Sequence, residues 1–127
     1  MKTFIYNQRV YFSDTDAQGI VYHAAYLNFA EHARTELGRE LHASGLSGGN
    51  AFVVKSISIS YEKPGYLDDM LTVETRVKDF GKVTIVFSQT VKRGDEMLAD
   101  MEVKVACINL ETKRPVRIGE DLLSLLS

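Results

Sequence analysis

A change of hydrophobic period near residue 50 constrains the fold of this 127-residue chain more than any other feature. Before it, apolar side chains recur every three or four residues from Tyr22 to about His42, which predicts one long amphipathic helix. At 1.5 Å per residue such a helix would be roughly 30 Å long, about the width of a small domain. The glycine-rich segment 44–50 would end it. After that segment, apolar and polar residues alternate, which is typical of strands.

Five segments show this alternation. The first spans Phe4–Phe12, and four others follow the glycine-rich segment. The apolar rows of these four are Ile57, Ile59 and Tyr61; Leu71, Val73, Thr75 and Val77; Val83, Ile85, Phe87 and Val91; and Met97, Ala99, Met101, Val103, Val105 and Cys107. Short turns at Pro64-Gly65, Phe80-Gly81 and Arg93-Gly94-Asp95 separate them, so neighbouring strands should be antiparallel. A short helix could follow from Gly119 to Leu126.

Together these elements predict an α+β fold in which the long helix is wrapped by a five-stranded antiparallel sheet, in a single domain over residues 1–127. One helix can cover only one face of a curled sheet. The other face and both edges would stay open, and open edges favour pairing with another chain. We therefore expect at least a homodimer in which edge pairing extends the sheet.

The composition excludes several classes of function. A formal net charge of −2 provides no basic field for nucleic acid. The N-terminal stretch lacks the features of a secretory signal, and no segment is long enough to cross a bilayer, so we expect a cytoplasmic protein without a membrane span. Cys107 is the only cysteine, which rules out an internal disulfide and a multi-cysteine metal site. Its place in an apolar row predicts a buried, inert thiol.

The segment from Arg9 to Tyr26 is the best candidate for chemistry. It carries Asp14 and Asp16 out of the first strand, turns at Gly19 and enters the long helix near residue 21 or 22, with His23 expected in the first turn. Backbone N–H groups at a helix start lack intrahelical partners and can polarise a carbonyl oxygen. Asp16 could then attack an acyl carbon or activate a water. The alternative is that these aspartates only cap the turn and the helix.

A metal site is a second alternative for the same residues. The run Asp14-Thr15-Asp16-Ala17-Gln18-Gly19 begins like a calcium-binding loop, with two carboxylates and a glycine at the sixth position. The twelfth position is Ala25, where a calcium loop needs a bidentate glutamate. Asp14, Asp16 and His23 could still make a three-ligand cluster, but local spacing offers no fourth donor. We expect no metal and no other cofactor.

Several motifs resemble the 4-hydroxybenzoyl-CoA thioesterase family, in its YbgC-like acyl-CoA branch. The signature residues are Arg9-Val10, Thr15-Asp16, Gly19-Ile20-Val21, His23 and Tyr26, and further similar stretches are Glu31–Glu36, Phe52–Lys55 and Leu67–Glu74. They follow in comparable order over most of the chain. The combination is specific, whereas the Asp-x-Asp-x-x-Gly run alone would be weak.

The resemblance implies a hotdog fold with active sites between the subunits of a homodimer, two dimers often forming a homotetramer. It assigns the catalytic carboxylate to Asp16 and the amide that polarises the thioester carbonyl to the backbone N–H of His23. The matching substrate-binding positions are Tyr26, Glu31 for the acyl pocket, and Val54 and Lys55 for the pantetheine arm. Glu31 stands where the hydroxybenzoyl-specific relatives have a shorter acid, so an aromatic substrate does not follow.

We therefore expect an acyl-CoA thioesterase that hydrolyses short-chain or aromatic acyl-CoA, with Asp16 as nucleophile or general base. Candidate partners for the CoA phosphates are Lys55, Lys92, Arg93, Lys113, Arg114 and Arg117, among which the sequence does not choose. An alternative of another class is a non-catalytic hotdog module that binds acyl-CoA or acyl carrier protein. A hotdog dehydratase is a third option, but it would place a histidine and an acid in a different pattern.

Overall fold

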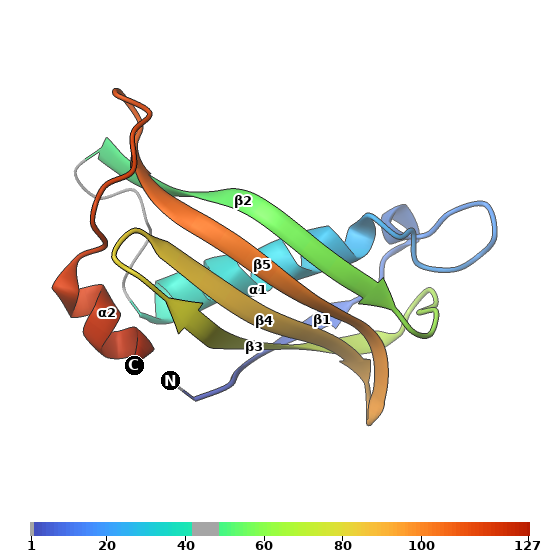
Figure 1. Ribbon diagram of the computed structural model, residues 1–127. Coiled ribbons are helices and arrows are strands. Elements are labelled where there is room, and N and C mark those ends of the chain that lie inside the picture. The colour runs from blue at the N-terminus through green and yellow to red at the C-terminus, as the bar shows by residue number, and fades with distance from the viewer. Residues whose placement is uncertain (1, 42–48) are drawn as a thin grey trace.

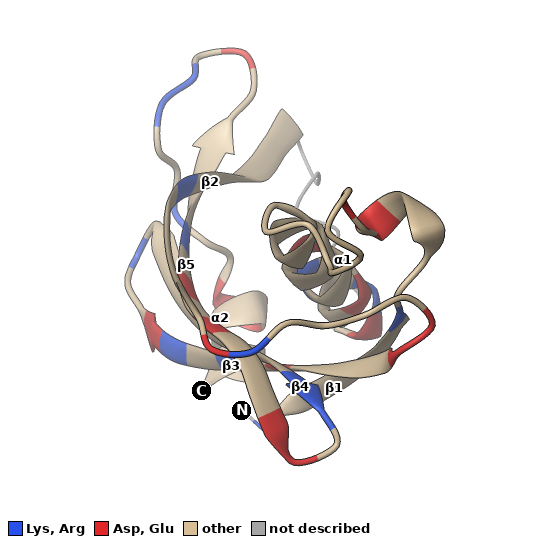
Figure 2. Ribbon diagram, turned by 90° about the vertical axis from the view of Figure 1, so that its right-hand side faces the viewer, with Lys and Arg blue, Asp and Glu red and all other residues tan. Residues whose placement is uncertain are grey.

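A curled antiparallel sheet encloses one long helix on its concave side, as the end-on view in Figure 2 shows. The computed structural model describes residues 2–41 and 49–127. The strands are β1 (Phe4–Arg9), β2 (Asn50–Tyr61), β3 (Met70–Phe80), β4 (Thr84–Arg93) and β5 (Glu96–Asn109), and the helices are α1 (Ala25–Glu40), α2 (Glu120–Leu126) and a 3₁₀ turn over Phe12–Asp14. The predicted α+β architecture is therefore confirmed.

The strand order is β1-β3-β4-β5-β2, and every neighbouring pair is antiparallel (Figure 1). Consecutive hairpins join β3, β4 and β5, because each of these strands is followed by a short turn. The two strands with long connections, β1 and β2, lie at opposite edges. Among the described residues, the outer edges of β1 and β2 therefore have no partner strand.

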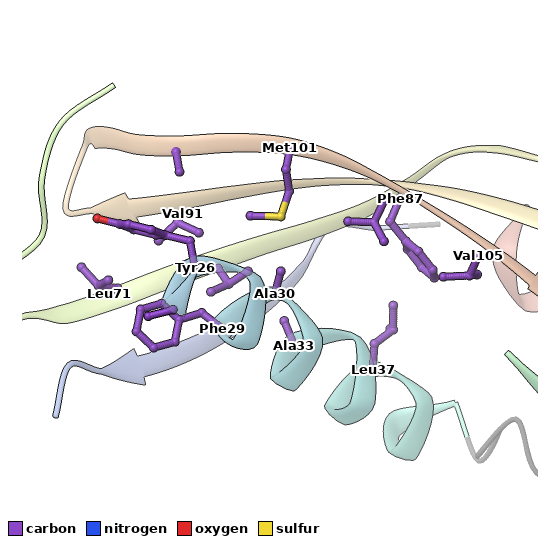
Figure 3. Packing of buried hydrophobic residues seen from close by; sticks show 14 of the residues in the cluster. Tyr26, Phe29, Ala30, Ala33, Leu37, Leu71, Phe87, Val91, Met101 and Val105 are labelled. Atoms are coloured by element: carbon purple, nitrogen blue, oxygen red, sulfur yellow. The ribbon is translucent and has the colours of Figure 1, made fainter. Parts of the chain in front are cut away.

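Helix α1 buries one apolar stripe against the sheet. Its buried residues are Ala25, Tyr26, Phe29, Ala30, Ala33 and Leu37, which recur at the predicted helical spacing. Figure 3 shows this stripe facing core residues of the strands, among them Leu71, Val91 and Met101. Fully burying a side chain such as Phe29 stabilises the fold by about 1.5–3 kcal/mol. Small residues at positions 30 and 33 let the helix backbone approach the sheet closely.

Three β-bulges decide which side chains face the core. Strand pairing skips Lys55 in β2 and Lys78 in β3, and a third register shift leaves Leu98 as the extra residue of β5. The last bulge corrects one sequence expectation, since Leu98 is fully buried whereas Met97, which simple alternation placed in the apolar row, is 41% exposed. The rest of that row is buried as predicted, including the thiol of Cys107, whose pKa is raised by burial.

The first strand and the helix have different bounds from those predicted. Strand β1 ends at Arg9, and Phe12 lies in the 3₁₀ turn with 81% of its surface exposed. Helix α1 begins at Ala25, because the N–H of Val21 is held by Gly65 O and that of Tyr22 by Asp14 O. These tertiary hydrogen bonds keep residues 20–22 out of the helix. The predicted helix end at His42 and most of the glycine-rich segment lie outside the described residues.

Candidate functional site

The chain folds back in a tight hairpin between Thr15 and Val21, which form an isolated antiparallel bridge. Asp16 N–H donates to Ile20 O at 3.0 Å, and Gly19 N–H donates to Asp16 O at 2.9 Å. Gly19 has a φ of +80°, a conformation that glycine adopts without steric cost. The hairpin therefore fixes the backbone of Asp16 at its corner, and Gly19 is what makes so short a turn feasible.

The carboxylate of Asp16 has one occupied oxygen and one available oxygen. Oδ1 accepts the N–H of Gln18 at 2.9 Å, which is the turn-capping role expected of an aspartate. No donor within residues 2–41 and 49–127 reaches Oδ2. The side chain is half-buried and lines a depression of about 460 Å³ together with Phe12 and Leu67. Capping and chemistry are therefore compatible in this residue, because they can use different oxygens.

Asp14 shapes the turn that precedes the hairpin. Its Oδ2 accepts the N–H of Tyr11 at 2.8 Å, closing the 3₁₀ turn, and its backbone oxygen accepts the N–H of Tyr22. Both contacts are structural. Asp14 thus has the turn-forming role that aspartate commonly takes, in contrast to Asp16.

His23 lies just before helix α1 and not in its first turn as the sequence predicted, because tertiary contacts delay the helix to Ala25. The N–H of Ala25 donates to Tyr22 O at 2.8 Å. The N–H groups of His23 and Ala24, between these bonded groups, have no acceptor in the described part of the chain. Two adjacent unpaired donors therefore stand at the helix start, where the positive end of the helix dipole adds to their effect.

The imidazole of His23 is exposed and contacts aromatic rings. Its centroid lies 4.5 Å from that of Tyr22 and 6.3 Å from that of Tyr61, the latter in an edge-on arrangement. No hydrogen bond of the ring is found among the described residues. Within residues 2–41 and 49–127 the imidazole therefore has no charged partner, and the backbone N–H of the same residue is unpaired.

The loop between β2 and β3 supports this hairpin from behind. Gly65 O accepts the N–H of Val21 at 2.9 Å, and Ile20 pairs with Tyr66 in an isolated bridge. A Cβ at Gly65 would lie 3.0 Å from Val21 Cγ2, so only glycine fits without displacing Val21. Arg93 holds the same loop by donating to Asp69 Oδ2 at 2.8 Å, and its guanidinium lies 5.6 Å from the Tyr66 ring centroid. The position of Asp16 thus depends on residues far along the chain.

Tyr26, predicted to contact substrate, is 2% exposed and belongs to the core of the subunit (Figure 3). Its hydroxyl accepts the N–H of Gly65 at 3.0 Å. Burial raises the pKa of Tyr26, while the bond from Gly65 and the charge of Arg93 act in the opposite direction. In this structure its side chain anchors the supporting loop beside Val21.

The other predicted substrate residues lie elsewhere, in the middle of α1 and on β2. Glu31 and Val54 line a groove of about 760 Å³ between α1, β2, β4, β5 and α2, which we call the α1 groove. Its walls are largely apolar and include Leu37, Phe52, Ile85, Phe87, Val105 and Leu122. Lys55 is exposed at the β2 bulge and does not line it. Within one chain, the structure therefore separates Asp16 and His23 from Glu31 and Val54.

A buried polar network beside the α1 groove was not expected from the sequence. Gln89 is fully buried and donates to Ala30 O and to Thr75 Oγ1, both at 2.9 Å. Arg34, at the groove wall, donates to Gln89 Oε1 at 2.8 Å. Burial lowers the pKa of Arg34, and the nearby charge of Glu31 raises it. The sequence did contain a signal for this buried polar residue, because position 89 belongs to the inward row of Ile85, Phe87 and Val91.

Comparison with known proteins identifies the family. Residues 18–99 match the family described as the thioesterase superfamily. A relative described as acyl-CoA thioesterase YbgC, from Haemophilus influenzae, is 43% identical over 123 residues, which cover 94% of this chain and 90% of the relative. This chain belongs to the thioesterase superfamily.

Other members of the superfamily agree in sequence and in fold. An acyl-CoA thioester hydrolase YbgC from Escherichia coli O6:H1 is 36% identical over 120 residues, covering 91% of this chain and 90% of the relative. A crystal structure from Bartonella henselae, titled a "Probable Thioesterase", is 33% identical with a TM-score of 0.88, and the match covers 93% of this chain and all of that one. The hotdog fold is thereby shown. The expected resemblance to YbgC-like thioesterases is confirmed as well.

Two of the basic residues that this thioesterase-superfamily chain could offer to CoA phosphates are already paired. Lys92 lies 3.2 Å from Glu74, and Arg93 binds Asp69 and Glu96. Lys55, Lys113, Arg114 and Arg117 are exposed and form no ion pair within the described residues. Along the ribbon in Figure 2, Lys and Arg alternate with Asp and Glu and do not gather on one element. Four of the six candidates are thus without a competing ion pair among the described residues.

Two further observations on this superfamily member concern metal ligands and membrane-spanning helices. In residues 2–41 and 49–127 no three His, Cys, Asp or Glu side chains are grouped so that they could hold a metal ion, so Asp14, Asp16 and His23 do not form the three-ligand cluster. No helix of the described chain has the length and apolarity needed to cross a membrane.

Proposed function

We propose that this chain is an acyl-CoA thioesterase that hydrolyses short-chain or aromatic acyl-CoA to the free acid and CoA. One observation carries the proposal: a carboxylate with an available oxygen lies on the hairpin that leads into two unpaired N–H groups at a helix start. These are the groups that acyl transfer needs, a nucleophile or base and an oxyanion hole. The names of the YbgC relatives support the same chemistry.

In the covalent route, Oδ2 of Asp16 attacks the thioester carbon while the N–H of His23 binds the developing oxyanion. The tetrahedral intermediate expels the CoA thiolate and leaves a mixed anhydride on Asp16, which water then hydrolyses. In the general-base route, Asp16 takes a proton from a water that attacks the same carbon, and that proton ends on the thiolate. Either route consumes one water and yields one acid and one thiol.

The remaining expectations are part of the same proposal. Glu31 and Val54 would contact the acyl chain in the α1 groove, Lys55 would border the pantetheine arm, and Tyr26 would act at the acyl site through the loop that it anchors. We propose a cytoplasmic homodimer that assembles to a homotetramer. The open edge supports it, because Val54, Ile57 and Tyr61 of β2 are 38–48% exposed.

The proposal is tested by measuring thiol release from a panel of acyl-CoAs that spans short, long and aromatic acyl groups. We expect turnover with at least one class, with a preference that reports the shape of the α1 groove. Binding of acyl-CoA or acyl carrier protein without thiol release across the panel would contradict the proposal and favour the non-catalytic module. A single turnover in ¹⁸O-labelled water would then test the covalent route, because label in Asp16 requires an anhydride that water opened at the Asp16 carbonyl carbon.

A further inference from the structure

Tyr61 lies at the end of β2 and reaches the peptide that carries one of the two unpaired N–H groups. Its hydroxyl donates to the backbone oxygen of His23 at 2.9 Å. Its ring makes edge-on contacts with His23 and with Tyr26, at centroid distances of 6.3 and 5.7 Å. The sequence placed Tyr61 in an apolar strand row and gave it no further role.

The two peptides before helix α1 are each held by their carbonyl group. In a trans peptide the C=O and N–H point in opposite directions, so fixing one fixes the other. The Tyr22–His23 peptide is held because Tyr22 O accepts the N–H of Ala25 at 2.8 Å. The His23–Ala24 peptide is held because His23 O accepts the hydroxyl of Tyr61. The first constraint is local to the helix start, whereas the second comes from the sheet edge.

We propose that Tyr61 is a positioning residue that fixes the His23–Ala24 peptide, so that the Ala24 N–H becomes a second oxyanion donor beside that of His23. This inference rests on the proposed thioesterase function. Oxyanion stabilisation depends on donors that are oriented before the charge develops, since reorientation during the reaction would cost free energy. A donor aimed by a single hydrogen bond loses that preorganisation when the bond is removed.

The surroundings of Tyr61 suit a permanent donor. Burial raises its pKa above the usual value for tyrosine, so the hydroxyl keeps its proton throughout the neutral range. The aromatic contacts with His23 and Tyr26 orient the ring independently of the hydroxyl. Removing only the oxygen atom therefore isolates the hydrogen bond from the packing.

The test compares Tyr61→Phe with Tyr6→Phe, since Tyr6 lies on β1 and its hydroxyl has no hydrogen-bond partner among the described residues. For Tyr61→Phe we expect a fall in kcat of about ten-fold, the equivalent of one hydrogen bond, with unchanged KM and oligomer size and a melting temperature lowered by no more than a few degrees. Tyr6→Phe should match the wild type in all four. A fall in kcat of less than about three-fold would overturn the proposal, as would a raised KM at unchanged kcat, which would mark Tyr61 as a substrate contact.

A second measurement reads the geometry without catalysis. In ¹⁵N–¹H spectra the amide signal of Ala24 should shift in Tyr61→Phe and remain in place in Tyr6→Phe, because only the first variant releases the His23 carbonyl. An unmoved Ala24 signal would refute the positioning role whatever the kinetics show. If the wild type hydrolyses no acyl-CoA, the proposed function fails, and the Ala24 shift still decides whether Tyr61 fixes this peptide.

Discussion

The N-terminal end of helix α1 and its C-terminal half differ in what holds their functional groups. At the N-terminal end, hydrogen bonds to backbone groups fix the hairpin of Asp16 and the peptides on either side of His23. Along the C-terminal half, side chains from three strands and α2 build the α1 groove. Under the proposed function, the groups assigned to the reaction would therefore tolerate little displacement, whereas the groove could change in shape through single side chains.

Removing the available oxygen of Asp16 should have the largest effect on the N-terminal end. Asp16→Asn keeps Oδ1 as acceptor for Gln18 but removes the nucleophile or base, so we expect kcat to fall about 10²- to 10⁴-fold at unchanged stability. Asp14→Asn is the matched control, because its amide oxygen can still accept the N–H of Tyr11 and close the turn. The measurement is kcat of both variants by steady-state kinetics, with the acyl-CoA that the wild type hydrolyses fastest. Equal activity in the two variants would remove Asp16 from the mechanism.

Displacing the supporting loop should have the next largest effect. In Gly65→Ala the new Cβ would lie 3.0 Å from Val21 Cγ2, and overpacking of this kind costs about 1–3 kcal/mol. Because Val21 ends the Asp16 hairpin, we expect kcat to fall about ten- to hundred-fold even where the protein stays folded. Gly81→Ala is the control, since its Cβ would meet only Thr84 Oγ1 at an ordinary 3.5 Å.

Calorimetry and kinetics on both glycine variants test this coupling. A lower melting temperature in Gly65→Ala with kcat at the wild-type value would contradict the proposed difference between the two ends of α1. The backbone support of the Asp16 hairpin would then not matter for turnover.

Narrowing the α1 groove should alter substrate preference and leave the chemistry intact. Val54→Trp adds bulk to the groove wall, so KM for the longest acyl-CoA accepted should rise about ten-fold while kcat for the shortest remains unchanged. Ile57→Trp is the control, because Ile57 lies on the same face of β2 but does not line the groove. A uniform fall in kcat for all acyl lengths would show that the groove is not the acyl site.

Truncating the His23 imidazole should have the smallest effect. His23→Ala retains the backbone N–H, and the ring makes only aromatic contacts, so we expect kcat to fall less than about three-fold. The pH profile of kcat should also keep its shape. A loss as large as that of Asp16→Asn would mean that the imidazole takes part in proton transfer.

The sequence predicted those parts of the fold that depend on local periodicity. The helix stripe of Phe29 and Ala33, the inward row of Leu71 and Val73, and the antiparallel hairpins all follow from spacing and short turns. The separate roles of the two aspartates also fit their contacts, since Asp14 closes a turn while Asp16 keeps an available oxygen.

What the sequence did not predict depends on contacts between distant segments. The start of α1 is set by Gly65 O, far along the chain, and local spacing placed His23 in the first helical turn. The hydrogen bond from Tyr61 to His23 joins residues 38 positions apart. The α1 groove draws its walls from α1, α2 and three strands. No window of sequence contains these partners together.

The bulge at Lys55 decides which single-residue deletions strand β2 can accept. Val54 and Ile57 are three positions apart, yet both pair with inward residues of β5, because Lys55 is in excess of the alternation. Deleting Lys55 would leave Val54 and Ile57 two positions apart, and Tyr61 would still face His23. Deleting Ser58 would turn Tyr61 to the opposite face. Among related sequences, deletions in this strand should therefore occur at the bulge and be absent between the bulge and Tyr61.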